Sequence, residues 1–133
     1  MARIISFGHR IPSKVRKEIE KELGHDTEFI EAEFYLNLNR PITPQIEKIL
    51  EPLIDGCGDV PFVILPGVSV ASGIIVAILH GILGRFPYIV ELTREKKEKW
   101  RWKLKEIHDT DKIRQNARTL RFTNASISPI SKP

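Results

Sequence analysis

Short apolar segments alternate with helical segments along the first 92 residues of the chain. Four segments have strand character. Of the three segments between them, 12–23 and 43–54 repeat apolar residues at three- and four-residue spacing, and 69–83 is a longer apolar segment. Such alternation is typical of parallel strands joined by crossover helices that cover both faces of one sheet. The predicted strands are 3–7, 27–36, 62–65 and 88–92, and the predicted helices are 12–23, 43–54 and 69–83.

Residues with strong turn and cap preferences mark the ends of these helices. Gly24 is expected to end the first helix as its C-cap. Thr43 and Pro44 are typical of an N-cap followed by the first helical position. Ser69 is expected to cap the third helix, and Gly67 to allow a tight turn before it.

The last third of the chain differs from the rest in charge and in pattern. Residues 94–133 hold 12 Lys and Arg against 5 Asp and Glu, whereas the residues before them hold 9 against 12. Residues 93–99 are too polar for a core and are expected to form a hairpin tip. Residues 100–107 alternate again and are expected to return as an antiparallel edge strand, followed by a basic helix over 110–120. A basic patch of this kind favours a polyanionic partner, although a solvated surface explains it equally well.

Length and pattern together predict one domain. A chain of 133 residues is long enough for one hydrophobic core and too short for two. Residues 1–122 are expected to form a single Rossmann-like, three-layer α/β domain with a mostly parallel sheet. The Ser- and Pro-rich residues 123–133 are expected to be a disordered tail.

The sequence disfavours a membrane span, a disulfide and several common cofactor sites. Pro and Gly interrupt the longest uncharged run, residues 60–83, so no membrane span is expected. Cys57 is the only cysteine, which leaves no internal disulfide and points to the cytoplasm. The sequence lacks GxGxxG, GxxxxGK[ST], HExxH and CxxC motifs, so no dinucleotide site, P-loop, metal or other cofactor is expected.

Two segments stand where ligands bind in open α/β sheets, beyond the carboxyl ends of strands. One follows the first strand and the other runs from the third strand into the apolar helix, where small residues and backbone amides suit an anion. A plain strand-to-helix turn explains the second segment equally well. The candidate ligand-binding residues are Gly8, His9, Arg10, Pro66, Gly67, Val68, Ser69 and Ser72.

The helix over residues 70–83 is apolar on all sides. A helix on the surface of a monomer carries a polar stripe, and this one has none. One face can cover the sheet, and the other then needs a partner. We therefore expect a homodimer whose two-fold axis brings two copies of the anion-binding turn together.

Residues 65–92 resemble the signature of a small CRISPR-associated family, the fifteenth Csx ancillary family found beside type III systems. The segment 6–11 resembles the first strand and turn of that family, and residues 106–118 resemble its C-terminal motif. The shared signature residues are Leu65-Pro66-Gly67, His80-Gly81, Gly84, Phe86-Pro87 and Ile89-Val90.

This resemblance implies a role in antiviral signalling by cyclic oligoadenylates. The first expectation is a homodimer that binds cyclic tetra-adenylate and sequesters this second messenger, with further assembly on the ligand left open. The alternative is a metal-independent ring nuclease in which His9 carries the proton and Arg10 stabilises the phosphate. A third interpretation is a general RNA-binding module with Trp100 and Trp102 as stacking groups.

Overall fold

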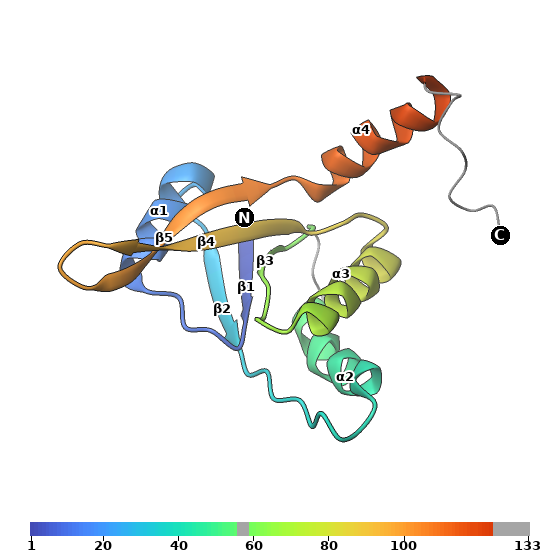
Figure 1. Cartoon of the computed structure of the whole chain (residues 1–133), viewed down its shortest axis with the longest axis horizontal. Helices are drawn as coiled ribbons and strands as arrows, with labels where there is room; N and C mark the ends of the chain where they lie inside the picture. Colours follow the sequence, from blue (N-terminus) through green and yellow to red (C-terminus); the bar gives the residue numbers. More distant parts are fainter. Residues whose placement is uncertain (56–58, 124–133) are drawn as a thin grey trace.

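A five-stranded sheet with helices on both faces makes up the domain in the computed structural model, which describes residues 1–55 and 59–123 (Figure 1). The strands stand side by side in the order β2-β1-β3-β4-β5. The elements are β1 (Arg3–Phe7), α1 (Ser13–Leu23), β2 (Glu28–Ala32), α2 (Ile42–Ile54), β3 (Phe62–Ile64), α3 (Ser69–Leu83), β4 (Tyr88–Lys96), β5 (Trp100–His108) and α4 (Thr110–Thr123).

The pairing of the strands confirms the predicted fold class. β1 pairs in parallel with β2 and β3, and β3 pairs in parallel with β4. β5 runs antiparallel to β4 at the edge of the sheet, and the basic helix α4 follows it. The chain is thus a Rossmann-like α/β domain with a mostly parallel sheet and an antiparallel C-terminal edge strand.

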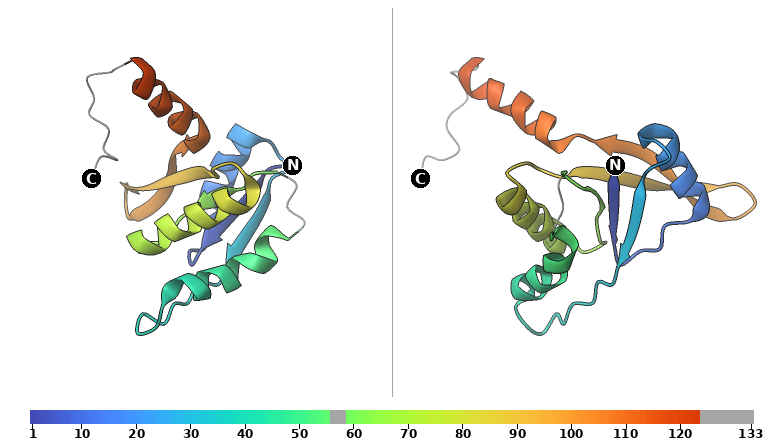
Figure 2. Two further views of the ribbon diagram at one scale, coloured as in Figure 1. Left: turned by 90° about the vertical axis from the view of Figure 1, so that its right-hand side faces the viewer. Right: turned by 180° about the vertical axis from the view of Figure 1, so that it is seen from behind.

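Two apolar clusters show how the three layers hold together. α1 packs on one face of the sheet through Val15 and Ile19, which meet Ile4 of β1. α2 and α3 cover the other face, where Leu50 and Ile75 are fully buried in the second cluster. Because successive residues of a strand point to opposite faces and β1 lies between β2 and β3, its residues from Ile4 to Phe7 are all buried. Figure 2 shows the sheet between these two helical layers.

Two predicted elements differ in length from those observed. The strand predicted over 27–36 ends at Ala32, because Ala32 lies opposite Phe7, the last residue of its only neighbour β1. The hairpin tip predicted over 93–99 is confirmed but is shorter, since β4 continues to Lys96 and β5 begins at Trp100. Polar side chains are tolerated there because the two strands form a ribbon that extends past the end of β3 (Figure 1).

The predicted helix ends are partly confirmed. Gly24 ends α1 with φ 106°, and its amide donates to the carbonyl of Glu20. Thr43 is not the N-cap of α2, because the helix already begins at Ile42 after Pro41. Two corrections concern the start of α3. Its N-cap is Val68 with no side-chain hydrogen bond, so Ser69 does not cap it. Gly67 does not have the positive φ that would require glycine, and a Cβ there would meet no atom within 4 Å.

The C-terminal segment forms an arm. α4 runs from Thr110 to Thr123 and leads away from the sheet (Figure 1), and the rest of the predicted tail lies outside the described residues. Among the helices of the described residues, none has both the length and the apolar character needed to cross a membrane.

Candidate functional site

The topology creates a crevice at the carboxyl ends of β1 and β3. From β1 the chain first crosses to β2 on one side and later returns to β3 on the other side. The strand order therefore reverses between β1 and β3, and open α/β sheets bind ligands at such a point. A cavity of about 590 Å³ lies here, within the size range of ligand pockets. We call it the switch-point pocket, and its lining residues are His9, Arg10, Pro12, Ile64, Leu65, Ile89, Val90, Glu91, Leu92 and Trp102.

The loop between β1 and α1 carries His9 and Arg10 to the rim of this pocket. Both residues also line a smaller hollow of about 290 Å³ on the β2 side, together with Glu31 and Tyr35. Gly8 lies at the base of the loop with φ 82°, and its amide donates to the carbonyl of Ala32 at 3.1 Å. The loop thus stands between two concave surfaces and presents an imidazole and a guanidinium to both.

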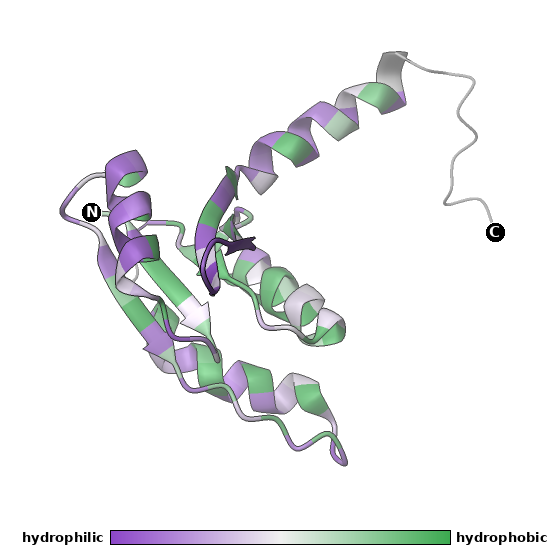
Figure 3. Ribbon diagram, turned by 60° about the vertical axis from the view of Figure 1, so that its left-hand side comes forward, coloured by the Kyte–Doolittle hydropathy of each residue, from purple (hydrophilic) through white to green (hydrophobic). Residues whose placement is uncertain are grey.

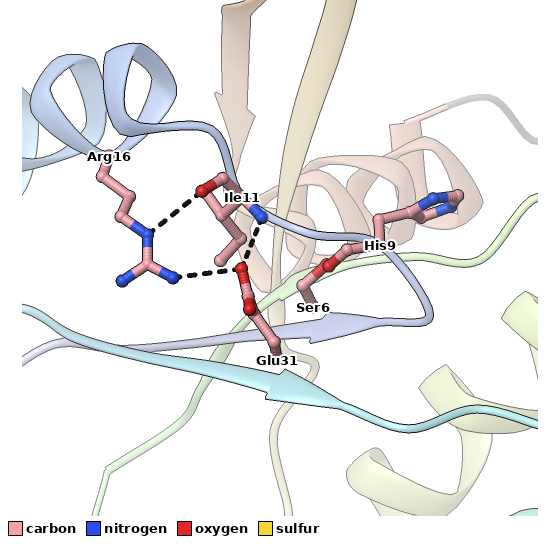
Figure 4. Close-up of polar contacts among 5 residues, drawn as sticks. All are labelled: Ser6, His9, Ile11, Arg16 and Glu31. Carbon is pink, nitrogen blue, oxygen red and sulfur yellow. Dashed lines mark hydrogen bonds and ion pairs between the residues drawn. The ribbon is translucent and has the colours of Figure 1, made fainter.

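A set of polar contacts holds this loop in place (Figure 4). The buried hydroxyl of Ser6 donates to the carbonyl of His9 at 2.8 Å. Glu31 Oε2 accepts from the amide of Ile11 at 2.7 Å and from the Arg16 guanidinium at 3.0 Å. Arg16 Nε also donates to the carbonyl of Ile11 at 3.1 Å. The loop is therefore fixed on both sides of Arg10, which limits the motion of the candidate binding residues.

The same contacts set the acidity of Glu31. The hydrogen bond from the Ile11 amide, followed by the contact with Arg16, lowers the pKa of the Glu31 carboxyl below its ordinary value of 4.5. The nearby charge of Arg10 acts in the same direction. The ionised carboxylate is consequently the form that stabilises the loop.

Replacing Glu31 with Gln is expected to reduce the pH dependence of stability in acid. A group whose pKa is lowered by folding stabilises the protein above its unfolded pKa, and this contribution is lost as pH falls through the folded pKa. The parent should therefore lose melting temperature on acidification below about pH 4.5, and Glu31→Gln should lose less while melting lower at pH 7. Thermal melts between pH 7 and 3 measure this, with Glu33→Gln as the matched loss of a neighbouring charge. Equal acid sensitivity in parent and Glu31→Gln would show that Glu31 does not hold the loop.

The second predicted segment does not reach the switch-point pocket. Of the described residues from Pro66 to Ser72, none lines it, although they follow β3 at the same edge of the sheet. The Ser72 hydroxyl donates to the carbonyls of Pro66 at 3.0 Å and Val68 at 3.2 Å, so its proton already has acceptors. Gly67, Val68 and Ser69 are exposed at the start of α3, where first-turn amides lack partners within the helix. An anion could still contact these amides from outside the pocket.

Sequence reasoning missed two residues of the site. Glu31 is 20 residues from Ile11 in the chain, and no local pattern connects them. The sequence predicted Trp102 as a stacking group for RNA or, more simply, as a packing residue, whereas it forms part of the pocket wall and is 41% exposed. One signal was available: Trp102 and Leu104 are two residues apart on β5 and so share a strand face, and Leu104 belongs to the cluster beneath α1.

A group of ionisable side chains lies along β4 and β5, where the sequence suggested no metal. The two ring nitrogens of His108 lie 2.8 Å from Glu91 Oε1 and 3.1 Å from Glu106 Oε2. Lys105 Nζ lies 3.2 Å from the other oxygen of Glu91. The three His and Glu ligand atoms are within 4.8 Å of one another, so the residues are of metal-binding type. The hydrogen bond from His108, then that from Lys105, lowers the pKa of Glu91. Cross-strand ion pairing accounts for the group as it stands.

Comparison with protein-family models, with curated proteins and with solved structures found no match for this chain. The fold and the pocket define its class, an α/β domain with a switch-point pocket bordered by His9 and Arg10. Any more particular function has to be argued from the chemistry of this site.

Proposed function

We propose that the protein binds a cyclic oligoadenylate, with cyclic tetra-adenylate as the first choice, and sequesters it as a homodimer. In this role it would lower the free concentration of the second messenger in type III CRISPR defence, acting in the cytoplasm. The observation that carries the proposal is the joining of Arg10, His9 and Trp102 around one mostly apolar pocket at the switch point.

Each of these side chains suits one part of an adenylate. The Arg10 guanidinium can donate paired hydrogen bonds to a phosphate. The Trp102 indole offers a flat surface for adenine stacking, which is worth about 1–3 kcal/mol per base in comparable sites. Apolar walls from Leu65 and Leu92 exclude water around a base. The pocket therefore has one group for each of the two recurring chemical features of the ligand.

The symmetry of the ligand supports a homodimer. A cyclic tetra-adenylate has two-fold symmetry, and two copies of the protein would present two pockets to its two halves. The exposed amides at the start of α3, near Ser69, would supply further contacts to phosphates at the same sheet edge. Additional assembly of dimers on the ligand is compatible with this arrangement.

The substitution Arg10→Ala is expected to weaken binding of cyclic tetra-adenylate about tenfold or more in isothermal titration, which corresponds to roughly 1.4 kcal/mol. Arg40→Ala removes the same charge from an exposed position outside the pocket and should bind like the parent. No heat from the parent at micromolar protein would end the proposal. Equal affinity of Arg10→Ala and the parent would place the phosphate elsewhere.

A ring nuclease is the second candidate, and the position of His9 on the pocket wall favours it. A ribose 2′-hydroxyl would attack the adjacent phosphorus and lose its proton to His9, while the bond from phosphorus to the 5′ oxygen breaks and that oxygen takes up a proton from water. The products are a 2′,3′-cyclic phosphate and a free 5′-hydroxyl, and Arg10 would stabilise the charge on phosphate. No metal is needed for this step.

Mass spectrometry of the ring after incubation with protein and EDTA separates the candidates. Linear products that disappear in His9→Ala favour the nuclease, whereas intact and recoverable ring favours sequestration. Weak binding of any oligonucleotide, falling steeply with salt and without preference for the ring, would favour the general RNA-binding alternative.

A further inference from the structure

α4 is attached to the domain only near its first turn. Asp111 is buried, accepts from the amide of Phe86 at 3.4 Å, and lies 3.7 Å from Arg85 Nε. The Thr110 hydroxyl donates to the carbonyl of Pro87, and the Arg114 guanidinium lies 6.0 Å from the centre of the Phe86 ring. The side chains from 115 to 121 are exposed. The helix therefore begins at a fixed first turn and then projects from the domain as an arm (Figures 1 and 2).

The arm is amphipathic, and its apolar side is uncovered. Ile113 and Leu120 are 55% and 51% exposed, and Ala117 lies between them at helical spacing. Basic side chains flank this stripe, including Arg118 and Arg121. A helix of this length is marginally stable in water unless its apolar face is packed. The arm thus has the composition of a helix that docks on an acidic, apolar surface.

A groove with these properties lies between α2 and α3. It has a volume of about 800 Å³. Its apolar residues are Leu50, Pro52, Ile54, Ile78 and Ile82, and its charged residues are Glu47, Glu51 and Asp55. Ile82 is 58% exposed, which is unusual for a large apolar side chain with apolar neighbours. Figure 3 shows the hydrophobic character of α3 along this side of the domain.

We infer that α4 of one copy docks into the α2–α3 groove of a second copy. The basic arm and the acidic groove are complementary in charge, and both carry exposed apolar side chains. The arm leads away from α2 in every view, so it does not fill the groove of its own chain (Figures 1 and 2). Reciprocal exchange of two arms closes a two-fold dimer and leaves neither surface exposed.

This inference deepens the homodimer part of the proposed function, but it does not depend on the nucleotide. The inference assigns α4 of a second copy as the partner that covers the exposed side of the apolar helix α3. The test therefore uses the full chain without any ligand, and ring binding is measured separately. A dimer that binds no ring counts against the proposed ligand alone, and a monomer that binds the ring counts against arm exchange alone.

Sedimentation velocity of the full chain is expected to show a dimer at micromolar concentration. Leu120→Asp and Ile82→Asp alter opposite sides of the contact, and each should yield a monomer. Both positions are exposed within one chain, so the sheet and the other helices should stay folded, while the released α4 loses part of its helical signal. A parent that stays monomeric overturns the inference, and so does a dimer that survives both substitutions.

Charge exchange provides the matched control. One variant carries Arg118→Glu and Arg121→Glu on the arm, and another carries Glu47→Lys and Glu51→Lys on the groove. Each variant alone places like charges against one another and should dissociate at least about tenfold more readily. Mixing the two restores opposite charges at both contacts, so the mixture should form a heterodimer. Failure of the mixture to associate would overturn arm exchange, as would α4-dependent binding of a monomeric parent to vesicles of anionic lipid.

Discussion

Replacing Phe7 with Ala is expected to destabilise the domain by about 3–5 kcal/mol. Phe7 is the last residue of β1, which lies between β2 and β3, and it is fully buried against α2 and α3. Its ring meets Phe34 edge to face, with ring centres 5.8 Å apart. The loss combines the transfer energy of the ring with the cavity that remains between β1 and the helices. It is comparable to a large part of the total stability of an ordinary domain.

Chemical denaturation monitored by circular dichroism measures this loss, with Tyr35→Ala as the control. Tyr35 is 91% exposed on the same segment as Phe34, so its removal should change the unfolding free energy by no more than about 0.5 kcal/mol. A similar small effect for Phe7→Ala would contradict the burial of its ring in the cluster between the sheet, α2 and α3.

Replacing Gly8 with Val is expected to lower the free energy of unfolding by about 2 kcal/mol and to weaken binding of cyclic tetra-adenylate. Gly8 has φ 82°, a conformation that costs an L-residue about 1–2 kcal/mol and a β-branched residue more. A Cβ at this position would also stand 3.4 Å from the Phe34 Cβ. Relief of this strain moves the loop, and with it the Arg10 side chain that would contact phosphate.

Gly67→Val is the matched substitution at the other predicted segment. Gly67 lacks the positive φ of Gly8, and an added Cβ meets open space, so the unfolding free energy should change little. Ring affinity of this variant then reports on the amides at the start of α3 alone, and an at least about tenfold loss is expected if a phosphate contacts them. Equal stability of Gly8→Val and Gly67→Val in thermal melts would contradict the structural difference between the two turns.

Local pattern was enough to predict the elements and their order. Residues 62–65 form a short continuous apolar run between Pro61 and Pro66, which is typical of a buried strand, whereas residues 12–23 repeat apolar residues at helical spacing. Gly24 was predicted as a C-cap from its place after the last apolar residue of α1, and its φ confirms this. The same pattern predicted that Gly8, His9 and Arg10 directly follow the end of a strand.

Features that depend on a distant partner were not predictable in this way. β2 ends at Ala32 because its neighbour β1 ends at Phe7, which the residues of β2 do not reveal. Polar residues 93–96 belong to a strand because β5 supplies hydrogen bonds opposite them. Ser69 resembles an N-cap by type, but the chain turns at Val68 instead.

The sequence by itself determined the α/β class, the helical and strand periods, and the loop that carries His9 and Arg10, because each depends on neighbours along the chain. Only the tertiary structure decided what surrounds that loop. Glu31 reaches it from β2, which pairs in parallel with β1, and Trp102 reaches it from β5, which pairs antiparallel with β4. Hydrogen bonds and pocket walls join residues that are distant in sequence, and their geometry exists only after the sheet has formed.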